Sequence, residues 1–272
     1  MRIDVHCHTF AEAIVDRAIK ALNGNLAEEY RTTFDGRLGT LVTELRKHGF
    51  DYATLCQIAT KPSQFEPIFK WSEAIRRGDF GEEAAKMILP LPSVHPADPD
   101  REAHLRQIAK AGYKGVKVHP YYQKLVLDSD DSIEYFKMVR NNGLYAITHA
   151  GFDAGFPHER ICDPVRVVRL LEAVPGLRLM LAHVGAWSDW ETADRYLIGG
   201  PFDIEISMSE TMCDDALFRR MILRHPADRL YFGSDWPWMS HDRALAYLDT
   251  VEMEPARREA LMGGNARRLL GL

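Results

Sequence analysis

The sequence predicts an α/β fold of the (β/α)8, or TIM-barrel, class, built as a single domain over residues 1–272 with an inserted loop after the first strand. Three observations lead to this prediction. The chain has 272 residues, and one such barrel typically needs about 250. Short apolar, β-branched runs recur along the whole chain, and amphipathic stretches separate many of them. Alternating strands and helices indicate a parallel sheet, and eight repeats favour a closed barrel over an open, doubly wound sheet.

Eight apolar runs are the predicted strands. Several are nearly continuous rather than alternating, as expected for parallel strands that are covered on both faces. The runs cover residues 2–7, 52–58, 87–94, 115–119, 144–149, 178–183, 202–207 and 230–234.

Amphipathic stretches predict helices over residues 99–111, 131–140, 164–174, 242–251 and 255–261. The third begins at Pro164, and proline suits the first turn of a helix. The longest connection joins the first two strands, and its glycine-containing part, residues 23–39, predicts the inserted loop over the barrel mouth. No linker divides the chain into two domains.

Composition and charge exclude several classes of function. The net charge is −5 and no basic stripe is visible, which argues against a nucleic-acid partner. No apolar run approaches the roughly 18 residues of a membrane span, and the first residues are charged where a secretion signal would be apolar. The four cysteines form no Cys-x-x-Cys pair and indicate reduced thiols. We therefore expect a cytoplasmic protein with a small-molecule substrate; homo-oligomer formation is left open.

Histidines gather at one end of the predicted strands. In barrel enzymes the active site lies at the C-terminal face of the strands, so polar residues there indicate catalysis. Five of the eleven histidines and one aspartate fall at this face: His6 and His8 at the end of the first strand, His119 at the end of the fourth, His149 at the end of the fifth, His183 at the end of the sixth, and Asp235 after the eighth. The other histidines are expected in loops or on the surface: His48, His95, His104, His158, His225 and His241.

The spacing of His6 and His8 suits a metal. Residues i and i+2 of a strand point the same way, so two imidazoles can converge on one ion. A third imidazole from the fifth strand and a carboxylate from the eighth would complete the site, with one position open for water. The ion would lower the pKa of that water toward about 7. We expect one divalent ion, with zinc favoured and manganese or another transition metal as alternatives; a second ion is less favoured.

The motifs at the strand ends resemble the amidohydrolase superfamily, and most closely its branch of metal-dependent hydrolases that also contains aminocarboxymuconate-semialdehyde decarboxylase. The motifs are IDVHCH at 3–8, GVKVHP at 115–120, THAG at 148–151, LAHVG at 181–185, GSDWP at 233–237 and NARRL at 265–269. The resemblance spans essentially the whole chain. It implies that His6, His8, His149 and Asp235 are metal ligands, that Asp235 can also take a proton, and that His183 is the acid/base residue near the metal.

Two-metal members of the family carry a bridging carboxylated lysine, or a glutamate, on the fourth strand, where this sequence has Lys117, with His119 two residues further on. Lys117 could be carboxylated, could contact an anionic substrate, or could be an interior charge paired with Asp4. The favoured branch usually has one metal, and His119 would then line the substrate pocket.

The substrate side is less defined. Aromatic residues after the strands could form the wall of a pocket for a ring or a planar acid: Tyr121, Tyr122, Trp187, Trp236 and Trp238. Lys61 and Arg160 lie in predicted loops at the active face and could bind a carboxylate.

Two reactions fit this pattern. The favoured one is hydrolysis, in which metal-activated water attacks an amide, ester or lactone of a small molecule, with His183 and Asp235 handling protons. The alternative is nonoxidative decarboxylation of a small unsaturated or aromatic acid, a carbon–carbon lyase reaction that would use the same ligands. A metal- or ligand-binding protein without turnover ranks below both.

Overall fold

The computed structural model describes residues 1–24, 26–156, 158–208 and 212–272. Its contacts divide the chain into two compact units. Unit one comprises Met1–Leu55, Glu73–Leu89 and Glu205–Leu272, and unit two comprises Cys56–Ser72 and Pro90–Ile204.

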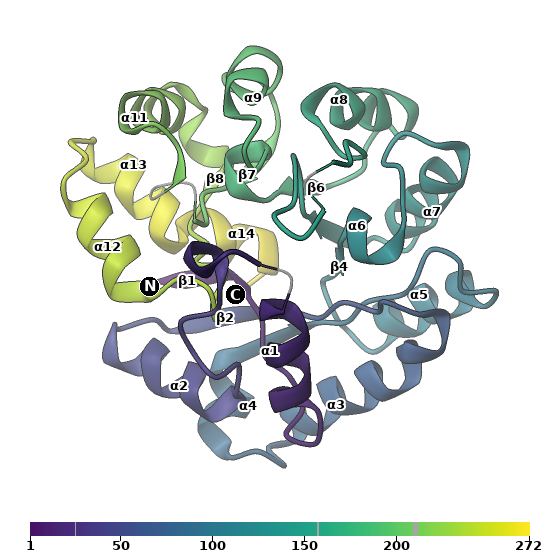
Figure 1. Ribbon diagram of the computed structural model, residues 1–272. Coiled ribbons are helices and arrows are strands. Elements are labelled where there is room, and N and C mark those ends of the chain that lie inside the picture. The colour runs from purple at the N-terminus through teal and green to yellow at the C-terminus, as the bar shows by residue number, and fades with distance from the viewer. Residues whose placement is uncertain (25, 157, 209–211) are drawn as a thin grey trace. The chain divides into compact units, whose positions relative to one another are not determined.

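Unit one holds strands β1 (Ile3–Cys7) and β8 (Leu230–Tyr231), nearly all of β2 (Tyr52–Cys56) and the start of β3 (Ile88–Leu91). β1 and β2 are parallel, with Ile3 opposite Tyr52. Helices α2 and α4 contact each other (Figure 1). Helices α11 and α12 are joined by an edge-on contact between the rings of Phe218 and Tyr247. The helices of this unit are α1 (Val15–Asn23), α2 (Leu38–Lys47), α4 (Glu82–Met87), α11 (Asp215–Arg224), α12 (His241–Asp249), α13 (Pro255–Glu259) and α14 (Asn265–Leu270).

Strand β1 contains an irregularity that affects the side chains at its end. Asp4 is opposite Ala53, whereas Cys7 is opposite Leu55, so β1 has one extra residue over this stretch. Such bulges re-aim side chains and are common beside active sites. On its other side, β1 contacts the segment after β8, where the Val5 amide donates to the Phe232 carbonyl at 2.9 Å. The end of β1 and residues 232–236 therefore lie side by side.

Unit two holds β4 (Gly115–Val118), β5 (Tyr145–Thr148), β6 (Leu179–Leu181) and most of β7 (Asp203–Glu205). These strands are hydrogen-bonded in this order and all pair in parallel. Helix α5 contacts α7, and α8 contacts α9 (Figure 1). The helices here are most of α3 (Phe65–Arg77), α5 (Arg101–Lys110), α6 (Pro120–Gln123), α7 (Asp130–Asn141), α8 (Pro164–Ala173) and α9 (Trp190–Tyr196).

Local sequence explains where two of these helices begin. The Ser129 hydroxyl accepts a hydrogen bond from the amide of Ser132 at the start of α7. The Asp163 carboxylate accepts from the amides of Val165 and Arg166 at the start of α8, and Pro164 occupies the first turn. Such caps satisfy amide groups that have no partner inside the helix.

The predicted α/β class with parallel strands is confirmed. All eight predicted strands and all five predicted helices are present among the described residues, with ends shifted by a few positions. Most strands end earlier than predicted because the chain leaves the ladder before the polar residues. β6 ends at Leu181, and a 3-10 turn with left-handed φ angles of 60° at His183 and 54° at Val184 follows. The single-domain organisation stays a prediction.

The predicted inserted loop, residues 23–39, contains a short 3-10 helix at Glu28–Tyr30, and position 25 lies outside the described residues. The amides of Thr33 and Phe34 both donate to the Pro237 carbonyl, at 2.9 and 3.2 Å. The loop thus lies against the segment that follows Asp235. None of the described helices is long and apolar enough to cross a membrane.

Candidate metal centre

Three side-chain donor atoms meet at the end of β1 in unit one. His6 Nε2 lies 3.0 Å from His8 Nε2 and 3.3 Å from Asp235 Oδ1, and His8 Nε2 lies 3.2 Å from the same oxygen. Two ligands that each lie about 2.0–2.1 Å from a metal, at tetrahedral or octahedral angles, are separated by about 2.9–3.4 Å. All three separations fall in this range, so the donor set fits a divalent ion.

The protonation of His6 supports the same conclusion. Its Nδ1 lies 2.9 Å from Glu205 Oε1, and a carboxylate can only accept a hydrogen bond. Nδ1 therefore carries the proton, and Nε2 presents its lone pair to the other two donors. A carboxylate on the second nitrogen of a histidine ligand is a recurrent feature of metal sites, because it fixes the orientation of the ring and raises its basicity.

Glu205 is itself held firmly. It is fully buried at the end of β7, and both its oxygens accept hydrogen bonds from Ser207, at 2.6 Å from the amide and 2.8 Å from the hydroxyl. Gly233 leaves the space that it needs, because a Cβ at that position would lie 2.4 Å from Glu205 Oε2. Glu205 was not among the predicted site residues, although it is an acidic residue at the end of an apolar strand, where the predicted histidines also lie.

Backbone hydrogen bonds fix the positions of the other two donor residues, Asp235 and His8. The Asp235 amide donates to the His6 carbonyl at 2.8 Å, and Asp235 has a left-handed φ of 59°. The His8 amide donates to the Trp236 carbonyl at 2.6 Å. The ring of Trp238 meets the His8 ring edge-on, with 5.7 Å between centroids. The segment after β8 therefore supplies one donor and places an aromatic ring beside another.

A buried ion pair, Asp4 with His241, lies two residues before His6. His241 Nε2 is 2.9 Å from Asp4 Oδ2, and both side chains are fully buried. Burial by itself would raise the pKa of Asp4, but hydrogen bonds from His241 and Ser234 and the charge of His241 lower it below its ordinary value. The expectation that His241 lies in a loop or on the surface is wrong, because it begins helix α12 and is fully buried. His225 lies in a loop as expected, but it is fully buried as well. For His241, the burial is offset by its carboxylate partner.

In unit two, two of the predicted site histidines are in contact. His183 Nε2 lies 3.2 Å from His149 Nδ1, and both side chains are buried. His149 Nε2 lies 2.6 Å from the carbonyl oxygen of Phe152, which can only accept, so it carries the proton and Nδ1 presents a lone pair. The Trp187 ring meets His183 edge-on at 5.4 Å. The roles of His149 as a metal ligand and of His183 as an acid/base residue stay predictions.

His119 extends this cluster. Its ring stacks on that of His149 with 4.5 Å between centroids, and its Nε2 lies 3.5 Å from Asp153 Oδ2. Lys117, on β4, is fully buried, and its carbonyl accepts from the Ser93 hydroxyl at 2.9 Å. Its predicted modification and its pairing with Asp4 stay predictions.

The predicted substrate contacts differ in their exposure. The Tyr121 hydroxyl donates to the Gly151 carbonyl at 2.7 Å, and burial raises its pKa far above the ordinary value. Trp236 is fully buried against Phe34, whereas Lys61 is exposed. Arg160 pairs with Asp189 at 2.6 Å. Any substrate contact of these residues stays a prediction.

Comparison with known proteins identifies the family. Residues 3–272 match the family model described as Amidohydrolase, which is nearly the whole chain. No curated protein sequence matches this chain.

Solved structures with the same fold cover the full chain. One is 2,6-dihydroxybenzoate decarboxylase complexed with 2,6-dihydroxybenzoate, with 17% identity, a TM-score of 0.72, and 100% of this chain and 99% of that chain covered. Another is a dihydroxybenzoic acid decarboxylase from Polaromonas sp. with bound manganese and an inhibitor, 2-nitroresorcinol, with 19% identity, a TM-score of 0.68, and coverage of 100% and 97%. A third, from Acinetobacter baumannii, is described as a probable 2-pyrone-4,6-dicarboxylic acid hydrolase with citric acid bound, with 15% identity, a TM-score of 0.66, and coverage of 100% and 99%.

Proposed function

Since this chain belongs to the amidohydrolase family, we propose that it is a metal-dependent decarboxylase that releases CO2 from a small aromatic or unsaturated carboxylic acid. The observation that carries the proposal is the triangle of His6, His8 and Asp235 donors, whose sides of 3.0–3.3 Å suit one divalent ion. The family motif adds His149 as the remaining protein ligand. The manganese bound by the Polaromonas decarboxylase makes Mn²⁺ the first ion to test, before Zn²⁺.

Decarboxylation is favoured over hydrolysis by the chemistry of the similar structures. Two of them, with full coverage of this chain, are decarboxylases of dihydroxybenzoic acids. Aromatic side chains lie beside a proposed ligand, Trp238 at His8, and beside the proposed acid/base residue, Trp187 at His183, and both suit a flat, unsaturated substrate. We therefore favour decarboxylation, the alternative prediction from the sequence, over hydrolysis.

In the proposed decarboxylation, each residue has a separate role. A bound divalent cation supplies a Lewis acid for the oxygen atoms of the substrate. The carbon–carbon bond to the carboxylate breaks, its electron pair stays on the substrate carbon, and that carbon takes up one proton. We assign the handling of this proton to Asp235 and His183. Glu205 keeps the proton of His6 on Nδ1 throughout, so that Nε2 stays available as a donor.

Hydrolysis is the second candidate, and one observation favours it. The Acinetobacter structure, with the same fold over this whole chain, is described as a probable hydrolase of a pyrone dicarboxylic acid. In this reaction Asp235 or His183 would take a proton from the attacking water. Both candidates share a carboxylated substrate and the same ligands.

One assay distinguishes the two reactions. The protein is stripped with a chelator, reloaded with Mn²⁺ or Zn²⁺, and incubated with a panel of hydroxybenzoic acids and of pyrone carboxylic acids. CO2 release that requires the metal supports the proposal. Ring opening of a pyrone without CO2 identifies a hydrolase instead. Absence of both products from a metal-loaded protein refutes the enzymatic role.

A matched variant tests the role of His183. Replacing His183 with Asn should leave metal binding unchanged and lower turnover by about 100- to 10,000-fold, the usual contribution of a general acid or base. His158, which is exposed, is the control: His158→Asn should turn over like the wild type. Equal turnover by both variants would remove His183 from the mechanism.

A further inference from the structure

The buried carboxylate of Asp4 joins the two segments that carry the donors of the metal centre. Its Oδ1 accepts from the amides of His6 and Ser234, at 2.9 and 3.1 Å. Its Oδ2 accepts from the Ser234 hydroxyl at 2.5 Å and from His241 Nε2 at 2.9 Å. These four hydrogen bonds account for the roughly four acceptor sites of a carboxylate. Asp4 is therefore fully engaged within the protein and has no capacity left for a ligand.

The first of these contacts supports the bulge in β1. The extra residue of β1 lies between Asp4 and Cys7, the stretch that contains His6. An extra residue disrupts the strand ladder locally. The Asp4 carboxylate receives the His6 amide at this point, so it fixes the backbone from which the His6 ring projects toward His8 and Asp235.

The Ser234 contacts support an unfavourable backbone conformation at Asp235. A φ of 59° is uncommon for any residue other than glycine and persists when the surroundings impose it. Here the preceding residue is held to Asp4 through both its amide and its hydroxyl. The same hydroxyl accepts from the Trp236 amide at 3.1 Å, so the backbone is held on both sides of Asp235.

His241 completes the cluster from helix α12. Its Nε2 donates to Asp4, and its Nδ1 is buried and has no hydrogen-bond partner among the described residues. The ring packs against Phe50, with 4.9 Å between centroids. Asp4 is thereby held in one orientation.

We propose that Asp4, Ser234 and His241 form a positioning cluster that sets the spacing of the His6 and Asp235 donors for the metal. The inference rests on the proposed metal binding. A buried charge in itself is weak evidence for stability, because well-packed apolar residues often replace such groups without loss. In this cluster, however, three of the four donors to Asp4 belong to His6 and to the residue before Asp235. The carboxylate therefore controls the two ligand-bearing segments directly.

The test measures metal binding separately from stability. In Ser234→Ala the carboxylate and the backbone contacts remain, but the hydroxyl that links Asp4 to the Trp236 amide is removed. Mn²⁺ binding by the stripped protein should weaken about 10- to 100-fold, which is the usual effect of losing a residue that supports the metal ligands by hydrogen bonds. The absorption spectrum of the Co²⁺-loaded protein, which reports ligand geometry, should also change. Asp4→Asn should act in the same direction and more strongly.

Asn265→Ala is the matched control. Asn265 is buried in the same unit and donates to the carbonyls of Ala227 and Leu230, at 2.7 Å each, away from the metal ligands. This variant should lower the unfolding temperature but keep the Mn²⁺ affinity and the Co²⁺ spectrum of the wild type.

Three outcomes overturn the inference. Wild-type affinity and spectrum in Ser234→Ala would show that the cluster does not position the ligands. An equal loss of affinity in Asn265→Ala would show that the effect follows from stability alone. Absence of Mn²⁺ binding by the wild-type protein would overturn the proposed function as well, which separates the failure of that proposal from the first two results. If Asp4→Asn does not fold, Ser234→Ala decides.

Discussion

At the scale of single residues, the state of the metal centre depends on which nitrogen of His6 carries a proton. Glu205 decides this through a contact of 2.9 Å with Nδ1. The two residues are separated by 199 positions in the sequence. Both residues lie at the C-terminal ends of parallel strands, and these ends meet at one edge of a parallel sheet. Only the packed structure shows that the two side chains touch.

The first prediction concerns Glu205→Gln. A glutamine amide can donate to Nδ1, which would shift the proton of His6 to Nε2 and block that donor. We expect Mn²⁺ affinity to fall about 10- to 100-fold, measured by titration of the stripped protein and detection of free Mn²⁺ by electron paramagnetic resonance. An unchanged affinity would mean that Glu205 does not control His6.

The second prediction concerns Gly233→Ala. The new Cβ would lie 2.4 Å from Glu205 Oε2 and 3.0 Å from His6 Cβ, so both side chains must move. We expect weaker Mn²⁺ binding and a loss of about 1–3 kcal/mol in the free energy of unfolding, as for other overpacked sites. Gly39→Ala in helix α2, where no atom lies within 4 Å of the new Cβ, is the control and should bind Mn²⁺ normally. Similar binding by the two variants would argue against a close fit around Glu205.

At the scale of elements, the sequence predicts much of the fold because buried parallel strands have a recognisable composition. Each of the eight apolar runs contains a strand. The histidines that follow them could be predicted as site residues from position alone. The residues that support the site through hydrogen bonds could not be predicted from the sequence, because contacts such as that of Asp4 with His241 join residues 237 positions apart. The left-handed turn at His183 and Val184 was also beyond prediction, since a β-branched residue rarely adopts that conformation.

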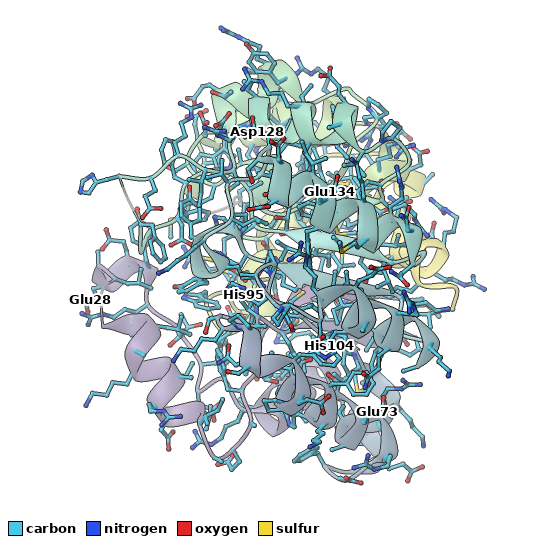
Figure 2. The ribbon with its side chains drawn as sticks, turned by 90° about the vertical axis from the view of Figure 1, so that its right-hand side faces the viewer. Glu28, Glu73, His95, His104, Asp128 and Glu134 are labelled. Carbon is cyan, nitrogen blue, oxygen red and sulfur yellow. The ribbon has the colours of Figure 1, made fainter. Side chains whose placement is uncertain are left out.

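Another element-scale feature is the link between the start of α7 and helix α8 in unit two. Asp128, before α7, pairs with Arg166 and Arg169 of α8; Figure 2 labels Asp128. Burial by itself would raise the pKa of Asp128. The hydrogen bonds from the two arginines lower the pKa by more than burial raises it, so it lies below its ordinary value. A carboxyl with a lowered pKa in the folded state stabilises the fold above its unfolded pKa of about 3.9. That contribution is lost as the pH falls through the folded-state pKa.

The third prediction follows from this sign. Asp128→Asn should lower the unfolding temperature at pH 7, and the difference from the wild type should shrink as the pH is lowered below about 4. Thermal unfolding followed by circular dichroism between pH 2.5 and 7 tests it. Glu134→Gln on α7, which removes the same charge from an exposed pair with Lys137, is the control and should have a smaller effect (Figure 2). A difference for Asp128→Asn that persists at low pH would contradict the assignment.

At the scale of the whole molecule, the chain is an amidohydrolase-family protein over residues 3–272, and its fold is shared with decarboxylases and with a probable hydrolase. Family membership explains the strand-end motifs and the donors that they supply. It does not choose between the two reactions, because both use the same ligands. The assay of CO2 release with hydroxybenzoic and pyrone carboxylic acids makes that choice.

The central claim is that His6, His8 and Asp235 hold one divalent ion. Equilibrium dialysis of the stripped protein against Mn²⁺, followed by elemental analysis, tests it most directly. We predict one ion per chain for the wild type and an affinity at least about 100-fold lower for His8→Ala and for Asp235→Asn, because each variant removes a metal ligand. Wild-type protein that binds no Mn²⁺ or Zn²⁺, or variants that bind as tightly as the wild type, would contradict the account.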